Sequence, residues 1–310
     1  MNNTKTGALV EGAIFAAITV LIGLLTFYLP FLFFLSYFWA IPTILISYRH
    51  GFKISLISGV SAAIIIAMFL GPLISVSALI TMLVPGMFLG FFMKRFKKQQ
   101  NLILASAGVT VLCSLVLVVL TAVLTGVNPI NIIDKSIAAI MLQITLASEL
   151  LKMPVPKDLG DSVKQLIVAL VMVAGVVITI FNLWLTQKIL HRMKIESPKL
   201  EPISHWHLSF NGLIFVSASI VFILINMYFF KESKIMTDIS LNLAVGLFYW
   251  FWFLGMATVV FFVNKTNLPK PVKVMIILGS ALIIGKVCAL AGYIEAAFDF
   301  RKLRPVIVKK

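Results

Sequence analysis

The chain has 310 residues, of which 61% are hydrophobic and only 12% are charged, and its mean hydropathy is +1.07. Soluble domains contain about 45–50% apolar and about 25% charged residues, so this chain has too few polar side chains to cover a water-soluble globule. The composition therefore excludes a soluble protein. The net charge of +15 does not indicate nucleic-acid binding, because Lys and Arg lie in short loops between apolar segments, as in membrane proteins.

Apolar segments recur along the whole chain, each near the roughly 20 residues that cross the hydrocarbon core of a bilayer as a helix. They do not show the alternation of apolar and polar residues that is typical of a membrane β-barrel. We therefore expect an all-α fold, a polytopic transmembrane helical bundle with eight or nine spans. The expected spans are residues 7–29, 31–48, 53–70, 73–93, 101–125, 164–189, 209–230, 239–263 and 274–297.

The distribution of Lys and Arg predicts which loops face the cytoplasm. If the N-terminus is inside, every second loop is rich in basic residues and nearly free of acidic ones, and residues 94–98 are the clearest example. The other loops carry acidic and basic residues in equal numbers. The positive-inside rule then predicts a multi-pass membrane protein with a cytoplasmic N-terminus. Nine spans would leave the basic tail at residues 300–310 outside, so the side of the C-terminus stays open.

Two parts are expected along the chain. Residues 1–189 hold a six-span bundle, and residues 190–310 hold two or three further spans with the basic tail. The longest connection, residues 126–163, lies outside in this scheme. Its apolar residues recur at helical spacing, which predicts an amphipathic helix. Such a helix lies either on the membrane surface or over a cavity as a lid, and the sequence leaves both open.

Small residues spaced by four positions let helices approach closely, which is how helices associate in lipid. The first segment has Ala13 and Ala17, the fourth has Gly86 and Gly90, and the last has Gly285 in a similar row. These residues are candidates for docking a partner protein. Packing within the bundle itself would produce the same pattern.

Charged residues within a span cost about 2.5–3.5 kcal/mol at mid-helix and therefore mark candidate functional positions. Lys286 lies near the middle of the last expected span, Glu295 lies nearer its far end, and Glu11 lies within the first span. Lys286 either reaches the interface along its own stem or pairs with a functional partner. Glu11 lies close to the cytoplasmic edge, so we expect an interfacial acid.

Catalytic signatures are missing from the sequence, which has no HExxH, no GxSxG and no P-loop. Acidic residues do not pair at one level deep in the membrane, so we expect no enzyme activity. His205 and His207 flank Trp206, which fits an aromatic belt at the membrane interface better than a metal site. Neither a metal nor a cofactor is therefore expected.

A family resemblance is carried by residues 41–95, which read IPTILISYRHGFKISLISGVSAAIIIAMFLGPLISVSALITMLVPGMFLGFFMKR. This run closely resembles the YybS-like family of uncharacterised bacterial membrane proteins, found mostly in Firmicutes. The opening EGAIFAAITVLIGLL and the closing GYIEAAFDFRKLR resemble the same family, so the similarity covers nearly the whole chain. Glu295 departs from it, because the family leads us to expect an aspartate there.

The first six expected spans also resemble, more remotely, the substrate-binding (S) components of energy-coupling factor vitamin transporters. In those proteins an AxxxA pattern on the first helix docks onto the transmembrane coupling subunit, and extracytoplasmic loops close over the substrate. The resemblance implies that Ala13 and Ala17 form the docking pattern here and that residues 126–163 form the closing loop. The additional C-terminal spans depart from the S components.

The leading functional hypothesis is a transport-type membrane component that binds a small solute and lacks its own ATPase. It would rely on a partner protein for energy, because the chain has no nucleotide-binding motif. The alternative is a membrane scaffold or regulatory protein of the cell envelope, comparable with MreD. The expected partners are the lipid bilayer, a small solute, and a coupling subunit or an envelope protein, and no nucleic acid is expected.

Overall fold

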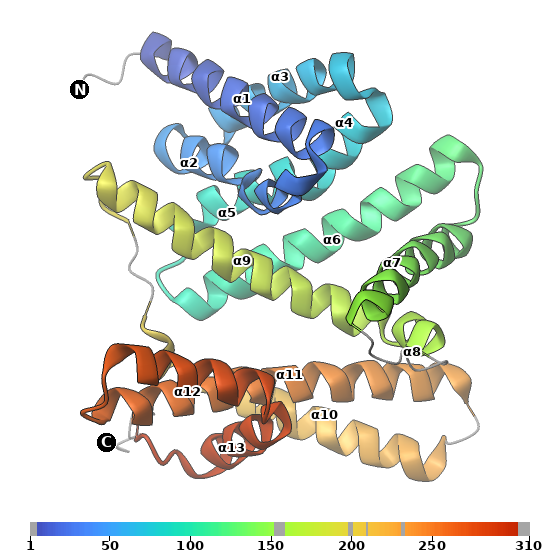
Figure 1. The fold of residues 1–310 in the computed structure, drawn as a ribbon, viewed down its shortest axis with the longest axis vertical. Helices are drawn as coiled ribbons and strands as arrows, with labels where there is room; N and C mark the ends of the chain where they lie inside the picture. The colour runs from blue at the N-terminus through green and yellow to red at the C-terminus, as the bar shows by residue number, and fades with distance from the viewer. Residues whose placement is uncertain (1–4, 152–158, 198–200, 209, 231–232, 303–310) are drawn as a thin grey trace. The chain divides into compact units, whose positions relative to one another are not determined.

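The computed structural model describes residues 5–151, 159–197, 201–208, 210–230 and 233–302, and helices make up nearly all of these residues (Figure 1). This part of the chain contains no β-strand, so the expected all-α fold is confirmed. In the described residues, nine helices are long and apolar enough to cross a membrane, or ten if the bent pair at residues 270–298 counts as one span. Eight of the nine match expected spans, and the ninth, Pro129–Leu146, was not expected. Helices form because lipid offers no partner to a backbone N–H or C=O group, and a helix satisfies both internally.

The elements follow the apolar segments of the sequence. The first half contains α1 (Lys5–Tyr28), η1 (Pro30–Phe38), α2 (Ile41–His50), α3 (Phe52–Leu70), α4 (Pro72–Ala78), η2 (Leu79–Leu83), α5 (Val84–Arg95) and α6 (Gln99–Thr125). The second half contains α7 (Pro129–Leu151), α8 (Leu159–Gln165), α9 (Ile167–Arg192), η3 (Ile203–His205), α10 (Phe210–Phe229), α11 (Lys234–Lys265), α12 (Lys270–Leu282) and α13 (Gly285–Phe298).

The connection at residues 126–163 contains a longer helix than an ordinary loop would. Within α7, Pro129–Leu146 is long and apolar enough to cross a membrane, although it is not one of the spans expected from the sequence. The amphipathic helix expected there is therefore present. Residues 152–158 of this connection lie outside the described residues, and the role of α7 as a lid or a surface helix stays a prediction.

The last expected span, residues 274–297, is not one continuous helix. It is divided into α12 and α13, whose axes are bent by 93°. Ile284 leaves the helical region (φ −115°, ψ 34°) and α13 begins at Gly285, and both isoleucine and glycine are weaker helix formers than alanine. The Cys288 thiol donates to the Ser280 carbonyl at 3.2 Å, which satisfies one of the carbonyls that the end of α12 leaves free.

The chain divides into two compact units. Unit 1 comprises residues 1–160 and 174–200, and unit 2 comprises residues 161–173 and 201–310. Helix α9 therefore contributes its first turns to unit 2 and the rest to unit 1. The boundary expected near residue 189 was placed by counting spans, whereas these two units are defined by packing. That boundary stays a prediction.

Unit 1 is held together by an apolar core and by hydrogen bonds between closely packed helices. Its core includes Ala16, Val20, Trp39, Ala62, Ile66, Leu83 and Met87. The Ser58 hydroxyl of α3 donates to the Gly12 carbonyl of α1 at 2.7 Å, and the Ser47 hydroxyl of α2 donates to the Met87 carbonyl of α5 at 2.6 Å. Such hydrogen bonds between helices require close backbone approach, which small residues permit.

Unit 2 is built around α11. Its core includes Leu208, Val216, Leu247, Phe251, Leu254, Ala289 and Ala296. Helix α13 crosses α11 where Gly255 and Gly292 face each other. A Cβ atom added to Gly292 would collide with the Phe251 carbonyl oxygen, and one added to Gly255 would collide with the Cys288 carbonyl oxygen. Only glycine allows this approach.

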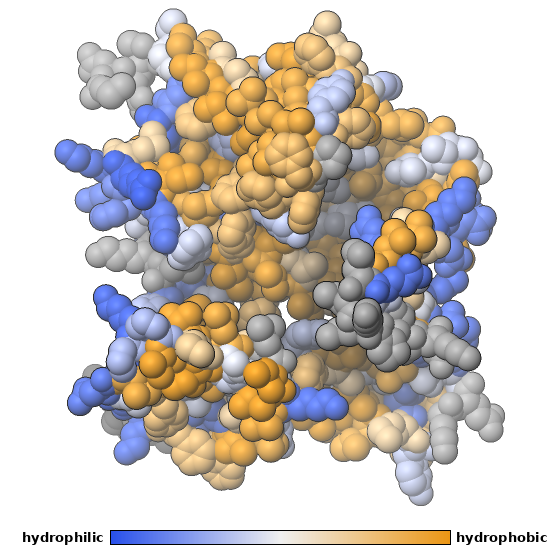
Figure 2. Space-filling view, viewed as in Figure 1, coloured by the Kyte–Doolittle hydropathy of each residue, from blue (hydrophilic) through white to orange (hydrophobic). Residues whose placement is uncertain are grey.

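The surface of each unit is largely apolar, as expected for contact with lipid. Figure 2 shows hydrophobic residues over most of the visible face, while hydrophilic residues gather toward its side edges. Many large apolar side chains are exposed, among them Met68 (79% exposed) and Val123 (75% exposed). A water-soluble protein rarely exposes such continuous apolar surface, so the surface agrees with a membrane-embedded protein.

Candidate functional site

Two irregular helical segments in unit 1 create space between its helices. Helix α2 is preceded by the 3₁₀ segment η1 and has Pro42 in its first turn. Helix α5 is preceded by the π-helical turn η2 and has Pro85 in its first turn. Proline removes a backbone hydrogen bond, and π turns occur frequently at functional sites. Both irregular segments therefore lie next to a proline.

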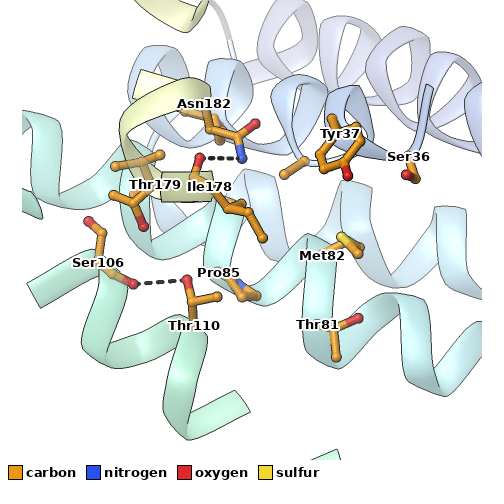
Figure 3. Close-up of a pocket in the computed structure, with 14 residues that line it drawn as sticks. Ser36, Tyr37, Thr81, Met82, Pro85, Ser106, Thr110, Ile178, Thr179 and Asn182 are labelled. Atoms are coloured by element: carbon orange, nitrogen blue, oxygen red, sulfur yellow. Dashed lines mark hydrogen bonds between the residues drawn. The ribbon is translucent and has the colours of Figure 1, made fainter. Parts of the chain in front are cut away.

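A cavity of about 140 Å³ lies between these segments and helices α6 and α9 (Figure 3). Its apolar lining includes Ile44, Met82 and Leu89. Its polar lining comes from several elements that are far apart in the sequence: Ser36, Tyr37, Thr81, Ser106, Thr110, Thr179 and Asn182. None of the described residues that line it is charged.

Three of the polar side chains around the cavity donate a hydrogen bond to a carbonyl of their own helix. The Thr110 hydroxyl donates to the Ser106 carbonyl at 3.0 Å, and the Asn182 side-chain nitrogen donates to the Ile178 carbonyl at 3.0 Å, as Figure 3 shows. The Thr81 hydroxyl donates to the carbonyl of Ser77 at 2.8 Å. These bonds hold the side chains against their helices, and they leave some oxygen atoms of the lining unused.

Two buried oxygen atoms of the lining have no hydrogen-bond partner, the hydroxyl oxygen of Ser106 and Oδ1 of Asn182. Ser106 is 2% exposed and Asn182 is 5% exposed. A buried polar group without a partner costs about 1–3 kcal/mol. Both residues line the cavity, but the two oxygen atoms themselves are covered by protein, so a molecule in the cavity would bond to them only after these side chains rotate.

The chemistry of the lining limits what the cavity can hold. Asn182 Oδ1 accepts a hydrogen bond, and the Ser106 hydroxyl donates or accepts one. An ion would be poorly stabilised, because burying an unpaired charge is far more costly than burying a neutral polar group. The volume is below the roughly 300–1,000 Å³ of common ligand pockets and close to a cavity of about 150 Å³ known to hold benzene. The site therefore suits a small, uncharged molecule.

Sequence reasoning did not find this cavity. Asn182 lies in the middle of a long apolar helix, and a polar amide there is a signal that could have been used. Ser106 gives no such signal, because serine is common in membrane helices as a packing residue.

The interfacial acid expected at Glu11 has two partners at the end of α2. One carboxylate oxygen forms an ion pair with Arg49, and the other lies 2.7 Å from His50 Nε2. Arg49 and His50 are the last two residues of α2, where cations are also favoured by the helix dipole. Glu11 thus joins α1 to α2, a pairing that the sequence analysis did not predict.

The small-residue candidates fall into different environments. Gly86 and Gly90 lie against α2, because a Cβ atom on either would collide with Thr43 or with the Ile44 carbonyl oxygen. They serve packing within unit 1. Ala13 and Ala17 are exposed on α1, whereas their neighbours on the other face are buried. Partner docking by this exposed pair stays a prediction.

The candidates on the last helix differ from their expected positions. Lys286 is the second residue of α13 rather than the middle of a span, and its side chain is exposed. Gly285 starts the same helix and lies beside Trp252. Glu295 is buried and accepts a hydrogen bond from Arg301. Arg301 belongs to the basic tail, and its pairing with Glu295 was not predicted from the sequence.

Comparison with known proteins adds the family. Residues 17–294 match the family DUF2232, described as a predicted membrane protein. The chain belongs to this family. The protein is also similar to an uncharacterised protein, YybS, of Bacillus subtilis (strain 168), with 24% identity over 292 residues that cover 89% of this chain and 91% of that protein.

The family confirms the expected resemblance to YybS-like membrane proteins and leaves the specific function open. No solved structure matches the chain. The more remote likeness to S components of energy-coupling factor transporters therefore stays a prediction. Within the described residues, three or more His, Cys, Asp or Glu side chains do not gather in any arrangement that could hold a metal ion.

Proposed function

We propose that this protein is a transport-type membrane component that binds a small, uncharged solute in the cavity of unit 1. The observation that carries the proposal is the pair of unpartnered oxygen atoms, Ser106 Oγ and Asn182 Oδ1, buried beside a cavity of about 140 Å³. They come from α6 and α9, so a solute that bonds to both joins two separate helices. A solute that bonds to both helices would shift the bundle toward the arrangement of α6 and α9 that it binds best.

Energy for transport would come from a partner protein, since the sequence has no nucleotide-binding motif. The exposed pair Ala13 and Ala17 on α1 offers a place where a partner helix could approach closely. Nearby, Val10 and Ile14 are each 56% exposed and would supply apolar contact. A coupling subunit docked on α1 would lie directly beside Glu11 and its partners Arg49 and His50.

Thermal unfolding of the purified protein tests the proposal. A panel of small uncharged solutes, such as amides and polyols, is compared with charged molecules of similar size, for example acetamide with acetate. A ligand that binds only the folded state at 100 times its Kd stabilises it by about 2.7 kcal/mol. We expect at least one uncharged solute to raise the melting temperature of the wild-type protein and its charged counterpart to have no effect.

Matched variants locate the binding. Asn182→Leu and Ser106→Ala should abolish the shift. Asn226 and Ser240 in unit 2 provide controls, because each is buried and has an unpartnered side-chain oxygen but does not line this cavity. Asn226→Leu and Ser240→Ala should keep the shift. Equal loss in both pairs would mean that the cavity is not the binding site.

The second candidate function is a scaffold or regulator of the cell envelope. The exposed small residues Ala13 and Ala17 favour it equally well, because they suit contact with any membrane protein. Gentle purification separates the two functions. An ATPase pair with a coupling subunit would support transport, whereas envelope proteins recovered without any bound solute would support the scaffold.

A further inference from the structure

The last two helices are each too short to cross a bilayer. Helix α12 has 13 residues and α13 has 14, which corresponds to lengths of about 20 and about 21 Å at 1.5 Å per residue. The hydrocarbon core is about 30 Å thick. Their axes are bent by 93°, so together they do not form one straight span either.

The start of α12 lies beside the end of α11. The Lys273 ammonium group donates to the Asn264 carbonyl at 3.3 Å, and only residues 266–269 separate the two helices. The chain therefore enters α12 at the level where α11 ends.

The turn between α12 and α13 lies near the middle of α11. A Cβ atom on Gly285 would be 3.4 Å from the indole nitrogen of Trp252, and Trp252 is about halfway along Lys234–Lys265. The Phe251 and Tyr293 rings follow in edge-to-face contact, with centroids 5.3 Å apart. Helix α12 thus leads away from the end of α11 toward its middle.

The residues that follow α13 return to the end of α11. The Arg301 guanidinium lies 6.0 Å from the ring centroid of Phe261, four residues before α11 ends at Lys265. The same guanidinium donates to the Ser204 carbonyl at 2.9 Å and to the Trp206 carbonyl at 2.6 Å. These contacts fix residue 301 beside the segment that precedes α10.

We propose that α12 and α13 form a re-entrant hairpin, which enters the membrane from the side where α11 ends and leaves on that same side. Lys302, the last described residue, then lies on the same side as Ser204 and Lys270, and Lys286 lies near the inner tip of the hairpin. This assignment goes beyond the proposed function and does not depend on it.

The opposite end of unit 2 is consistent with this arrangement. The Gln165 side chain donates to Asp238 at 2.9 Å, and Asn242 Oδ1 accepts from the Ala169 backbone N–H at 2.9 Å. The beginnings of α9 and α11 therefore lie side by side, at the far end of α11 from Arg301. Helix α10 then crosses once between the two ends of unit 2.

Charge indicates which side is which. The end of unit 2 that holds the hairpin entrance and exit carries Lys265, Lys270, Lys273 and Lys302 against Glu201 and Asp299, and its Arg301 pairs with Glu295. At the other end, the described charged residues include Asp161 and Asp238 with Lys164 and Lys234. The positive-inside rule places the basic end in the cytoplasm. The described start of the basic tail, whose side the sequence left open, is then cytoplasmic.

Single-cysteine labelling in intact cells tests the proposal. In a background with Cys113→Ala and Cys288→Ala, cysteine is introduced as Lys310→Cys, Lys270→Cys or Ser233→Cys and exposed to a membrane-impermeant maleimide. We expect Lys270→Cys and Lys310→Cys to be labelled only after the cells are opened. Ser233→Cys, at the start of α11, should be labelled from outside.

The hairpin is tested by comparing the labelling of residue 310 with that of residues 270 and 233. Matching reactivity at 310 and 270 supports the hairpin, whichever side they prove to face. Matching reactivity at 310 and 233, with 270 on the other side, would overturn it, because the pair would then cross the membrane as a broken span. If the triple substitution reduces folding, the same comparison is made with short peptide tags inserted after the same residues.

Discussion

Arg301 and Glu295 form a buried ion pair in unit 2, with Nε of the arginine 2.8 Å from Oε1 of the glutamate. The two side chains are 0% and 4% exposed. Because the guanidinium also bonds to the carbonyls of Ser204 and Trp206, all three of its nitrogens have a partner. The end of the described chain is therefore tied both to α13 and to the segment before α10.

Removing the arginine should destabilise unit 2. Arg301→Met leaves the carboxylate of Glu295 buried without a counter-charge, and breaking a buried pair in this way costs about 3–5 kcal/mol. We expect a clearly lower melting temperature and faster proteolysis within unit 2. Lys302→Met changes a neighbouring, exposed residue and serves as the control. Equal melting temperatures for the two variants would show that the ion pair contributes little.

Enlarging the glycine contact between α11 and α13 should also destabilise the protein. Gly292→Ala forces a methyl group into the Phe251 carbonyl, and overpacking of this kind costs about 1–3 kcal/mol or more. Gly246→Ala is a matched control on α11, since its added methyl group would meet nothing within 4 Å.

The control should leave stability unchanged or raise it by up to about 1 kcal/mol, because alanine is the better helix former. Thermal unfolding of both variants in the same detergent measures the difference. Greater loss from Gly246→Ala than from Gly292→Ala would contradict the packing of α13 on α11.

Neutralising Glu11 should have a smaller effect that depends on salt. The side chains of Glu11 and Arg49 are 20% and 21% exposed, and pairs that solvent reaches contribute about 1 kcal/mol or less. Glu11→Gln should lower the melting temperature slightly at low salt, and high salt should shrink the difference because it screens the pair. Glu196→Gln, which changes an exposed acid, should show no such trend. A salt-independent loss would indicate that Glu11 acts through packing instead.

Hydropathy predicted most of the fold because it measures what lipid requires. The segments that became α1, α6, α9 and α11 were found near their observed bounds, since a long apolar run has no alternative to a helix in a bilayer. Hydropathy does not register a bend, so the division at Gly285 was not predicted. An amphipathic helix such as α7 has a hydropathy between that of a loop and that of a span. The sequence alone therefore did not show whether residues 129–146 cross the membrane.

The candidate site was less predictable than the fold. Glu11 and Glu295 stood out because charge is rare in a membrane segment, yet their partners Arg49 and Arg301 could be found only from the packing. Ser106 and Asn182 belong to helices that meet through faces whose rotation the sequence does not specify. A cavity between such helices depends on how they pack, so the small polar residues that line it could not be recognised from the sequence.

Mass spectrometry of the intact protein, released from lipid nanodiscs, tests the solute-binding cavity most directly. We expect a small, uncharged molecule bound to the wild-type protein and to Asn226→Leu, and no bound molecule on Asn182→Leu. Retention of the same molecule by Asn182→Leu, or an unoccupied wild-type protein that no uncharged solute can load, would contradict it.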